Sequence, residues 1–415
     1  MNAILVHPPQ QPIRAEIRLA SSKSESNRAL IINALTHFKS VLTNVSEARD
    51  SQTMQRLLLS EEPVADVIDA GTTMRFLTAY FAITGQTKTM TGTARMCERP
   101  IGLLVDALRT LGATINYQKN EGYPPLSLEG FKYSGVNQLR IRGDVSSQYI
   151  SALLMIAPLL PEGLTIALEG EIGSRPYIEM TLHQMACFGI EYRADWPAKT
   201  ITIAAQEYQP KPYAIESDWS GASYWYSLVA LAEDAEVELL GLKEESLQGD
   251  SAIVQIMEHL GVQSTFTERG VLLQKTTAAP ALGWDFTHCP DLAQTVAVCC
   301  AMKNIHLTLT GVESLKIKET DRIFALQQEL RKLGAELLEV EPNTTYEVKR
   351  LDAGEPSGTK PSIHTYDDHR MALAFAPVGM LRPVLIEEPG VVVKSYPSFW
   401  EHLGRITDLE ELELS

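Results

Sequence analysis

Six nearly all-apolar runs recur along the chain, and each follows a short cluster of polar residues. A brief turn and a short alternating segment, such as GLTIALEG at 163–170, come after each run and favour a strand. The runs begin at Ser22, Gly71, Ser146, Ser217, Pro290 and Asp367. A helix that is apolar on every side has to be buried, so each run predicts an inner helix.

A second kind of helix is predicted after these strands, with apolar residues on one face only. Its examples are the segments 98–113, 175–190, 248–262 and 318–335, several of which end in Gly, as a helix C-terminus favours. The whole pattern predicts a unit of about 70 residues that occurs six times, with one helix inside and one outside against a small sheet.

The polar clusters all stand at the N-termini of the predicted inner helices, and they include Lys23, Arg28, Arg75 and Arg370. If the inner helices of one domain are parallel, their free N–H groups and positive dipole ends gather on one surface that attracts anions. For any single cluster, N-capping by Ser, Thr or Asp explains the residues equally well.

The net charge of the chain is −16, from 36 basic and 52 acidic residues. Such a surface repels nucleic acid and anionic lipid, so we expect neither as a partner. The odd number of five cysteines, without a CxxC pair, favours a reduced, cytoplasmic compartment. We find neither a signal-peptide pattern at the N-terminus nor an apolar run of membrane-spanning length.

Metal and nucleotide motifs are not found in the sequence. The nine histidines are scattered, and HExxH, Cys/His clusters and the P-loop pattern GxxxxGK[ST] do not occur. We therefore expect no metal and no cofactor, and an unrelated P-loop enzyme is set aside.

Ten short motifs then occur in one order along the chain: SKSESNRAL, DAGTTMR, ERPIG, SSQY, SRPYIEMT, QGD, PDLAQT, KIKETDR, DDHRMA and a late Lys before SYP. Most are weak signals singly, but the ordered set resembles the 5-enolpyruvylshikimate-3-phosphate synthase branch of the enolpyruvyl transferase family from end to end. The resemblance implies an enzyme that transfers the enolpyruvyl group of phosphoenolpyruvate to shikimate 3-phosphate, in the shikimate pathway to chorismate and aromatic amino acids.

The resemblance also implies the fold. We expect an α/β protein of two similar domains, each with three βαβαββ repeats in an inside-out α/β barrel, and an active site in the cleft between them. Residues 1–20 and 216–415 would form the phosphoenolpyruvate side, and 21–215 the shikimate 3-phosphate side. The crossings fall near Ala20 and Glu216, the cleft would close on substrate, and the protein would be a monomer.

Binding residues follow from the motifs in the same way. Shikimate 3-phosphate would be bound by Lys23, Ser24, Arg28, Ser146, Ser147, Gln148, Ser174, Tyr177, Asp291, Ser314 and Lys318. Phosphoenolpyruvate would be bound by Lys23, Gly71, Arg99, Gln148, Arg322, Arg370 and Lys394. Two phosphates and two carboxylates carry about −5 to −6, which seven of these cations nearly balance. Any one Lys or Arg taken alone is more simply a solvated surface residue.

The expected catalytic residues are Asp291, Glu319 and Lys23. Asp291 would accept the proton of the 5-hydroxyl and Glu319 would protonate the methylene carbon, while Lys23 stands between the substrates. Taken without the family, Asp291 is an N-cap and Glu319 a first-turn acid that satisfies the helix dipole. His369 is expected to orient its neighbours.

Three positions depart from the family pattern: Asp69 stands where Asn is common, Phe76 where Pro is common, and Ser314 where Asn is common. Gly71 is kept, and with it we expect inhibition by glyphosate.

Two alternatives stay open at this point. The sister enzymes that use UDP-N-acetylglucosamine typically have a Cys five residues before the Arg equivalent to Arg99, whereas Cys97 lies two residues before it. A non-enzymatic paralogue with the same fold would be expected to lack Asp291, Glu319 or Lys23, and all three are present.

Overall fold

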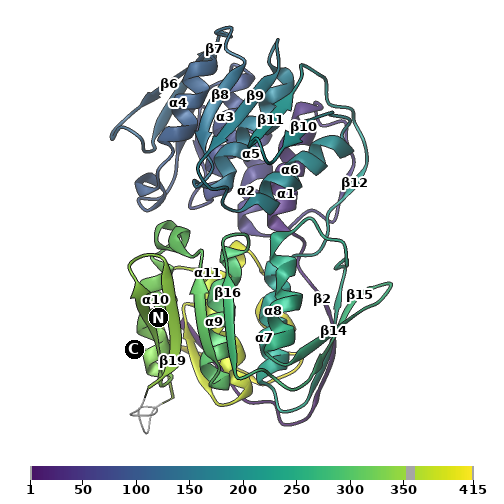
Figure 1. The fold of residues 1–415 in the computed structure, drawn as a ribbon, viewed down its shortest axis with the longest axis vertical. Coiled ribbons are helices and arrows are strands. Elements are labelled where there is room, and N and C mark those ends of the chain that lie inside the picture. Colours follow the sequence, from purple (N-terminus) through teal and green to yellow (C-terminus); the bar gives the residue numbers. More distant parts are fainter. Residues whose placement is uncertain (1, 352–359, 414–415) are drawn as a thin grey trace. The chain divides into compact units, whose positions relative to one another are not determined.

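The computed structural model describes residues 2–351 and 360–413, and the chain forms two compact units. Unit 1 consists of Met1–Ser22 and Glu216–Ser415, and unit 2 consists of Lys23–Ile215 (Figure 1). These borders lie next to the predicted crossings at Ala20 and Glu216. Each unit has a hydrophobic core of its own.

Unit 1 contains three four-stranded sheets among its described residues. The first has the order β20 (Ser362–Ile363), β21 (Val384–Glu387), β1 (Asn2–Val6), β22 (Leu409–Glu413). The second has the order β14 (Val262–Phe266), β15 (Gly270–Lys275), β13 (Ala235–Leu240), β2 (Ile13–Arg18). The third has the order β16 (Ala281–Asp285), β17 (His306–Thr310), β19 (Thr345–Arg350), β18 (Ala335–Glu341).

The first strands of the chain therefore belong to the unit that contains its C-terminal half. β1 lies antiparallel between β21 and β22, with Val6 opposite Val384, and β2 runs parallel to β13, with Ile13 opposite Ala235. The chain leaves unit 1 beside its point of return, because Ser22 N donates to Glu216 O (2.8 Å) and Asp218 N donates to Ala20 O (2.8 Å).

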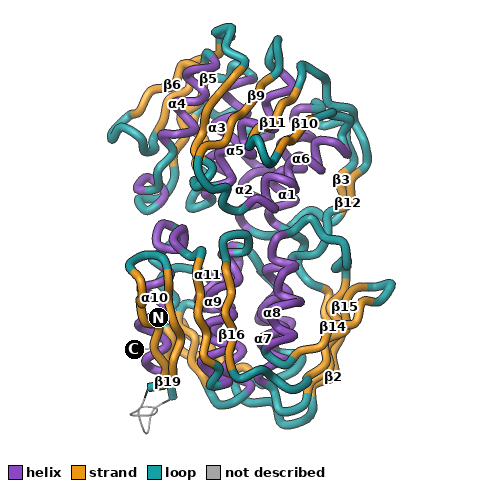
Figure 2. Tube along the Cα trace, in the orientation of Figure 1, coloured by secondary structure: helices purple, strands orange, loops and turns teal. Residues whose placement is uncertain are grey.

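The inner helices of unit 1 pack against one another between its sheets (Figure 2). They are α7 (Trp219–Leu231), α9 (Ala293–Lys303) and α11 (His369–Phe375), which continues as the 3₁₀ helix η6 (Ala376–Met380). Every residue of α7 except Ser220 is buried, as its nearly all-apolar sequence requires.

The outer helices and the short 3₁₀ helices of unit 1 complete its repeats. They are α8 (Ile253–His259), α10 (Arg322–Lys332), α12 (Phe399–Leu403), η3 (Gly249–Ala252), η4 (Pro290–Leu292), η5 (Glu313–Ile317) and η7 (Pro389–Lys394). α10 buries Arg322, Ala325, Leu326 and Glu329, which recur at helical spacing on one face.

Unit 2 repeats the plan with two four-stranded sheets and one smaller sheet. The strand orders are β10 (Arg193–Asp195), β11 (Thr200–Ile203), β9 (Leu164–Glu169), β8 (Gln138–Arg142), and β4 (Val64–Asp66), β5 (Thr87–Thr91), β7 (Leu126–Phe131), β6 (Ala113–Tyr117). The smaller sheet pairs β3 (Leu42–Thr43) with β12 (Tyr213–Ala214) in parallel. Asn44 ends β3 with a left-handed φ of 57° and donates to Ile215 O (2.8 Å), which limits this sheet to two short strands.

The inner helices of unit 2 are α1 (Lys23–Leu35), α3 (Gly71–Ile83) and α5 (Ser147–Ile156), which continues as η2 (Ala157–Leu159). The others are α2 (Arg49–Leu58), η1 (Met96–Glu98), α4 (Gly102–Leu111) and α6 (Arg175–Cys187). All six predicted inner helices form, three in each unit. Each unit by itself has the α/β plan that was predicted for the two similar halves of the chain.

Candidate active site

Arg322, at the start of α10, binds three carboxylates while only 1% of it is exposed. Its Nε donates to Asp368 Oδ2 (2.7 Å), its Nη1 to Asp291 Oδ1 (2.9 Å) and its Nη2 to Glu319 Oε2 (2.8 Å). Burial alone would lower the pKa of this guanidinium, but the three carboxylates raise it above its usual value. The Arg is therefore a permanent cation that fixes two proposed catalytic carboxylates.

Asp291 lies inside η4, and its side chain turns to cations instead of capping α9. Arg370 Nη2 donates to Asp291 Oδ2 (2.8 Å), and Lys318 Nζ lies 3.5 Å from Asp291 Oδ1. Burial favours a higher pKa for Asp291, but Arg370, Lys318 and Arg322 outweigh it and hold the pKa well below its usual range. The same burial lowers the pKa of Lys318.

Glu319 stands two residues before the N-cap of α10, which is Asp321. Its two carboxylate oxygens are bound by different cations, Arg322 Nη2 at 2.8 Å and Lys394 Nζ at 3.2 Å. Lys394 ends η7 and is 1% exposed. Unit 1 thus gathers Asp291, Glu319, Lys318, Arg322, Arg370 and Lys394 in one cluster, which we call the unit 1 cation cluster.

Four residues outside the predicted set complete this cluster: Asp368, Tyr224, Ser220 and Asp250. Asp368 caps α11 by accepting from Arg370 N (2.9 Å), and Tyr224 OH accepts from Arg370 Nη1 (3.0 Å). Ser220 Oγ donates to the buried Asp250 and accepts from Arg370 Nη2 (3.4 Å). Asp368 and Asp250 lie within the motifs DDHRMA and QGD, so these motifs could have pointed to both residues. Ser220 and Tyr224 lie in none of the ten motifs.

His369, which was expected to orient its neighbours, is buried at the start of α11, with Nδ1 3.6 Å from Asp368 Oδ1. The starts of all three inner helices of unit 1 meet here, since Ser220 belongs to α7, Asp291 precedes α9 and Arg370 belongs to α11.

In unit 2, Lys23 begins α1 and donates from Nζ to Asp50 Oδ2 (3.0 Å) on α2. Asp50 is 3% exposed and also accepts, through its backbone O, from Thr73 Oγ1 (3.2 Å) on α3. Asp50 was not predicted, because an acid in the first turn of a helix is common for dipole reasons alone.

Gly71 begins α3 and allows two guanidinium groups to lie close to its backbone. A Cβ at this position would lie 2.8 Å from Arg75 Nη1 and 2.8 Å from Arg99 Nη1. Arg75 cannot easily move, because it donates to Gly71 O (2.8 Å) and Pro100 O (3.1 Å). The absence of a Cβ is therefore required for the position of Arg99.

The start of α5 is bonded to the start of α3, since Gln148 Nε2 donates to Thr72 Oγ1 (2.9 Å). Ser146 is the N-cap of α5 and accepts from Gln148 N (3.4 Å), so the capping explanation holds for its side chain. Ser147 follows it and is buried. The three helix starts of unit 2 thus lie together, as those of unit 1 do.

Arg28 has an internal role that the sequence did not suggest. Its guanidinium donates to Thr181 Oγ1 (2.7 Å), Ser24 O (2.8 Å), Ser151 Oγ (3.2 Å) and Tyr177 O (3.3 Å), which ties α1 to α5 and α6. Burial lowers the pKa of Arg28 to about 10. Binding of shikimate 3-phosphate by Arg28 and Ser24 stays a prediction.

The remaining predicted residues and the unusual positions lie as follows. Ser174 precedes α6 with a left-handed φ of 52°, and Tyr177 and Phe76 have ring centroids 5.9 and 5.4 Å from Arg28 Cζ. Both oxygens of Asp69 accept from Arg49 Nη2, each at 2.9 Å. Ser314 is exposed in η5, and Cys97 donates from Sγ to Gly92 O (3.7 Å).

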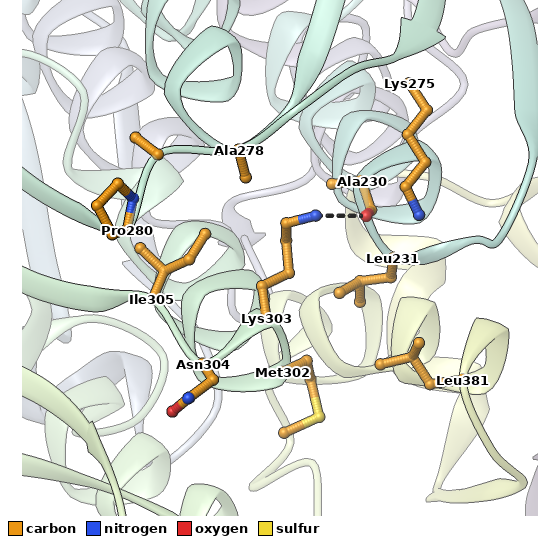
Figure 3. A pocket seen from close by; sticks show the side chains of 11 residues that line it. Ala230, Leu231, Lys275, Ala278, Pro280, Met302, Lys303, Asn304, Ile305 and Leu381 are labelled. Atoms are coloured by element: carbon orange, nitrogen blue, oxygen red, sulfur yellow. Dashed lines mark hydrogen bonds between the residues drawn. The ribbon is translucent and has the colours of Figure 1, made fainter.

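A separate cavity of about 390 Å³ lies at the opposite ends of the inner helices of unit 1 (Figure 3). Lys303 Nζ donates to Ala230 O (2.9 Å) and Lys275 Nζ to Ala232 O, so both lysines cap the C-terminal carbonyls of α7. Glu233 and Asp234 partly offset the burial that lowers the pKa of Lys275. The polar groups of this cavity are explained by helix capping.

Residues 2–351 and 360–413 hold neither a candidate membrane span nor a candidate metal site. Their helices include none with the length and apolar character of a membrane span, and no three His, Cys, Asp or Glu side chains among them cluster as metal ligands would.

The family described as EPSP synthase (3-phosphoshikimate 1-carboxyvinyltransferase) matches residues 8–60 and 55–403. The chain belongs to the EPSP synthase family. The resemblance drawn from the motifs is thereby confirmed, together with the transferase class and the enolpyruvyl transfer of the shikimate pathway that go with this family.

Curated relatives in the family cover nearly the whole chain. A 3-phosphoshikimate 1-carboxyvinyltransferase of Bacteroides fragilis is 48% identical over 405 residues, or 97% of each chain. One from Klebsiella pneumoniae is 36% identical over 426 residues, with 96% of this chain and 97% of the relative covered. A solved EPSP synthase from Acinetobacter baumannii has a TM-score of 0.78 at 19% identity, with both chains fully covered, and so supports the fold.

Proposed function

We propose that this chain transfers the 1-carboxyvinyl group of phosphoenolpyruvate to the 5-hydroxyl of shikimate 3-phosphate and releases phosphate. The observation that carries the proposal is the unit 1 cation cluster, in which Arg322, Arg370, Lys318 and Lys394 surround Asp291 and Glu319. Five free cysteines support a reduced, cytoplasmic setting.

Both groups of helix starts are suited to anions, and we infer that both bind the same pair of substrates. Arg322, Arg370 and Lys394 of unit 1 would bind the carboxylate and phosphate of phosphoenolpyruvate, with Arg99 from unit 2 beside the backbone of Gly71. Ser146, Ser147, Gln148, Ser174 and Tyr177 are the proposed ligands of shikimate 3-phosphate in unit 2, with Lys23 between the substrates, and unit 1 would add Ser314 and Lys318.

The proposed reaction is an addition followed by an elimination. The 5-hydroxyl oxygen attacks C2 of phosphoenolpyruvate, and its proton goes to Asp291. C3 takes a proton from Glu319, which enters this step in its protonated form, and becomes a methyl group. The C2–O bond to phosphate then breaks, the departing phosphate takes the proton from Asp291, and C3 returns a proton to Glu319, so that the enol ether is restored. The cations stabilise the charge on the departing phosphate.

Without substrate, the two carboxylates neutralise the cations that bind phosphoenolpyruvate in this proposal. Because Arg370, Lys318 and Arg322 hold the pKa of Asp291 low, the free enzyme has a weak base. When an anionic substrate takes up these cations, their hold on Asp291 weakens and its pKa rises. Substrate binding would thus prepare the base as well as the electrophile.

Phosphate release from phosphoenolpyruvate tests the proposal, with shikimate 3-phosphate and UDP-N-acetylglucosamine offered in parallel as acceptors. We expect phosphate to be released when shikimate 3-phosphate is the acceptor and not when UDP-N-acetylglucosamine is the acceptor. Asp291→Asn and Glu319→Gln should each lower turnover by about 10²-fold or more, because each removes one proton transfer. Asp285→Asn, an exposed carboxylate at the end of β16, is the matched control and should turn over normally.

Release with UDP-N-acetylglucosamine would identify the sister activity instead. Normal turnover of Asp291→Asn or Glu319→Gln would remove that residue from the chemistry while leaving the overall reaction in place.

A further inference from the structure

The turn that leads into α11 has an unusual backbone. Tyr366 and Asp367 are consecutive non-glycine residues with a φ of 54° each, and Asp368 N donates across the turn to Thr365 O (2.9 Å). A turn whose two central residues both have positive φ is normally built from Asn and Gly. A bulky aromatic residue such as Tyr366 is a clear exception and is kept there only when surrounding contacts hold it.

Glu329 on α10 supplies those contacts from a buried position, since it is 1% exposed. Tyr366 OH donates to Glu329 Oε1 (2.9 Å), while His364 N (3.1 Å) and Lys332 Nζ (2.7 Å) donate to Glu329 Oε2. Burial and Glu329 itself raise the pKa of Tyr366, so the phenol keeps its proton and remains the donor. The phenol ring also packs edge-on against His364, with centroids 4.6 Å apart.

One helix therefore contacts the turn at two points. Arg322 and Glu329 are seven residues apart on α10, which is about two helical turns and places them on one face. Arg322 binds Asp368 and Glu329 binds Tyr366, so α10 fixes both the turn and the residue after it.

The turn sets the position of the N-terminus of α11, the end that holds Arg370. Asp368 caps the helix at Arg370 N (2.9 Å), and Arg370 then reaches Asp291 Oδ2 (2.8 Å) and Tyr224 OH (3.0 Å). A change in the turn would alter the direction from which Arg370 approaches a substrate, although neither Tyr366 nor Glu329 is among the proposed substrate ligands.

We propose that Tyr366 and Glu329 are positioning residues for phosphoenolpyruvate: their hydrogen bond holds the left-handed turn that aims Arg370 and Asp368. This inference rests on the proposed function, because it assigns Arg370 to that substrate. A purely structural role would lower stability alone. If the residues have a positioning role, their substitution also weakens the binding of one substrate and not the other. That selectivity distinguishes a positioning role from a purely structural one.

Tyr366→Phe is the direct test, because it removes the hydroxyl and keeps the ring. The matched control is Tyr346→Phe, since Tyr346 OH also donates to a glutamate of unit 1, Glu339 Oε1 (2.8 Å), on strands away from the turn. We expect Tyr366→Phe to raise the KM for phosphoenolpyruvate about tenfold and leave that for shikimate 3-phosphate unchanged. Tyr346→Phe should change neither KM.

Two further variants strengthen the test. Glu329→Gln keeps an acceptor for the phenol but loses the carboxylate, so its KM for phosphoenolpyruvate should lie between those of wild type and Tyr366→Phe. Asp367→Gly removes the steric cost of a positive φ at the second central position of the turn, and in the Tyr366→Phe background it should bring the KM back toward wild type.

A readout without turnover comes from amide hydrogen exchange. The Asp368 amide should exchange about tenfold faster in Tyr366→Phe than in wild type or Tyr346→Phe, because the turn opens more often. Unchanged exchange, or a KM for phosphoenolpyruvate equal to that of wild type, would overturn the inference. A wild-type protein that releases no phosphate would refute the proposed function instead, and the exchange rate would still decide whether Tyr366 holds the turn.

Discussion

Buried side chains of the unit 1 cation cluster have charged partners, so that single substitutions there should change the binding of particular substrates. Arg322 bonds Asp291, Glu319 and Asp368 from a buried site, and loss of one partner would leave another charge without compensation. At the residue scale, therefore, the most informative changes are those that alter geometry or a single charge and leave the cluster otherwise complete.

Gly71→Ala is one such change. Its Cβ would lie 2.8 Å from Arg99 Nη1, and Arg99 must move because Arg75 is fixed by two carbonyls. We expect the KM for phosphoenolpyruvate to rise about tenfold, since one charged hydrogen bond is misplaced, and inhibition by glyphosate to weaken in parallel. Steady-state kinetics measures both.

The control for this variant is Gly283→Ala on β16, where an added Cβ meets nothing within 4 Å. An unchanged KM for phosphoenolpyruvate in Gly71→Ala would show that Arg99 does not bind this substrate. A wild type that glyphosate does not inhibit would contradict the expectation drawn from Gly71.

Asp250 should make the stability of unit 1 depend on pH. Burial, and the nearby charge of Asp291, raise the pKa of Asp250 from 3.8 to about 6. Its stabilising contribution is therefore complete below the unfolded pKa and is lost as pH rises through 6, by about 3 kcal/mol at most. Relative to wild type, Asp250→Asn should become progressively more stable between pH 4 and about 7.

Urea unfolding across that pH range measures the effect, with the exposed Asp285→Asn as the reference. A difference between Asp250→Asn and wild type that stays constant with pH would contradict the assignment.

At the scale of elements, the loop that enters α3 shows how a departure from the family pattern is accommodated. Asp69, in place of Asn, sits between the left-handed Ile68 (φ 59°) and Gly71, and Arg49 on α2 neutralises it. A carboxylate at a helix N-terminus would compete with an anionic ligand, and the ion pair removes that competition.

Arg49→Met should therefore raise the KM for phosphoenolpyruvate about fivefold, because about 1 kcal/mol of repulsion from Asp69 is uncovered. The double variant Arg49→Met/Asp69→Asn should return the KM to that of wild type. Steady-state kinetics at low ionic strength gives the comparison, and a double variant as impaired as the single one would contradict it.

The six inner helices were predictable because an all-apolar run has one stable environment. Their ends were less predictable: the run from Asp367 leaves the α-helix after Phe375, where Pro377 removes a hydrogen-bond donor, and continues as η6. Asp291 likewise looked like an N-cap of α9, whereas it lies within η4 because the preceding Pro290 begins a tighter turn.

Of the candidate site, the sequence predicted only residues that lie in or next to the recognised motifs. Asp50, Tyr224 and Glu329 were missed because an acid at a helix start, a buried tyrosine and a glutamate paired with a lysine three residues on in its helix all have ordinary structural explanations. Only their bonds to Lys23, Arg370 and Tyr366 reveal more. The internal bonds of Arg28 were missed for the converse reason, because a motif suggested a ligand and said nothing of Ser151 or Thr181.

At the scale of the whole molecule, a chain of net charge −16 buries cations within the first turns of its inner helices, at Arg28, Arg75 and Arg370, or on neighbouring segments, at Arg99, Arg322 and Lys394. The repeat explains why this happens twice, since each unit buries three such helices around its own core. We propose that the cations of the two units serve one reaction.

The need for both units can be measured as kcat/KM for phosphoenolpyruvate in Arg99→Met, from unit 2, and in Arg370→Met, from unit 1. Both values should fall at least about tenfold at saturating shikimate 3-phosphate. The exposed controls Arg95→Met and Arg405→Met, which remove surface ion pairs with Glu98 and Glu401, should match wild type. A wild-type value in either Arg99→Met or Arg370→Met would show that one substrate does not need both units.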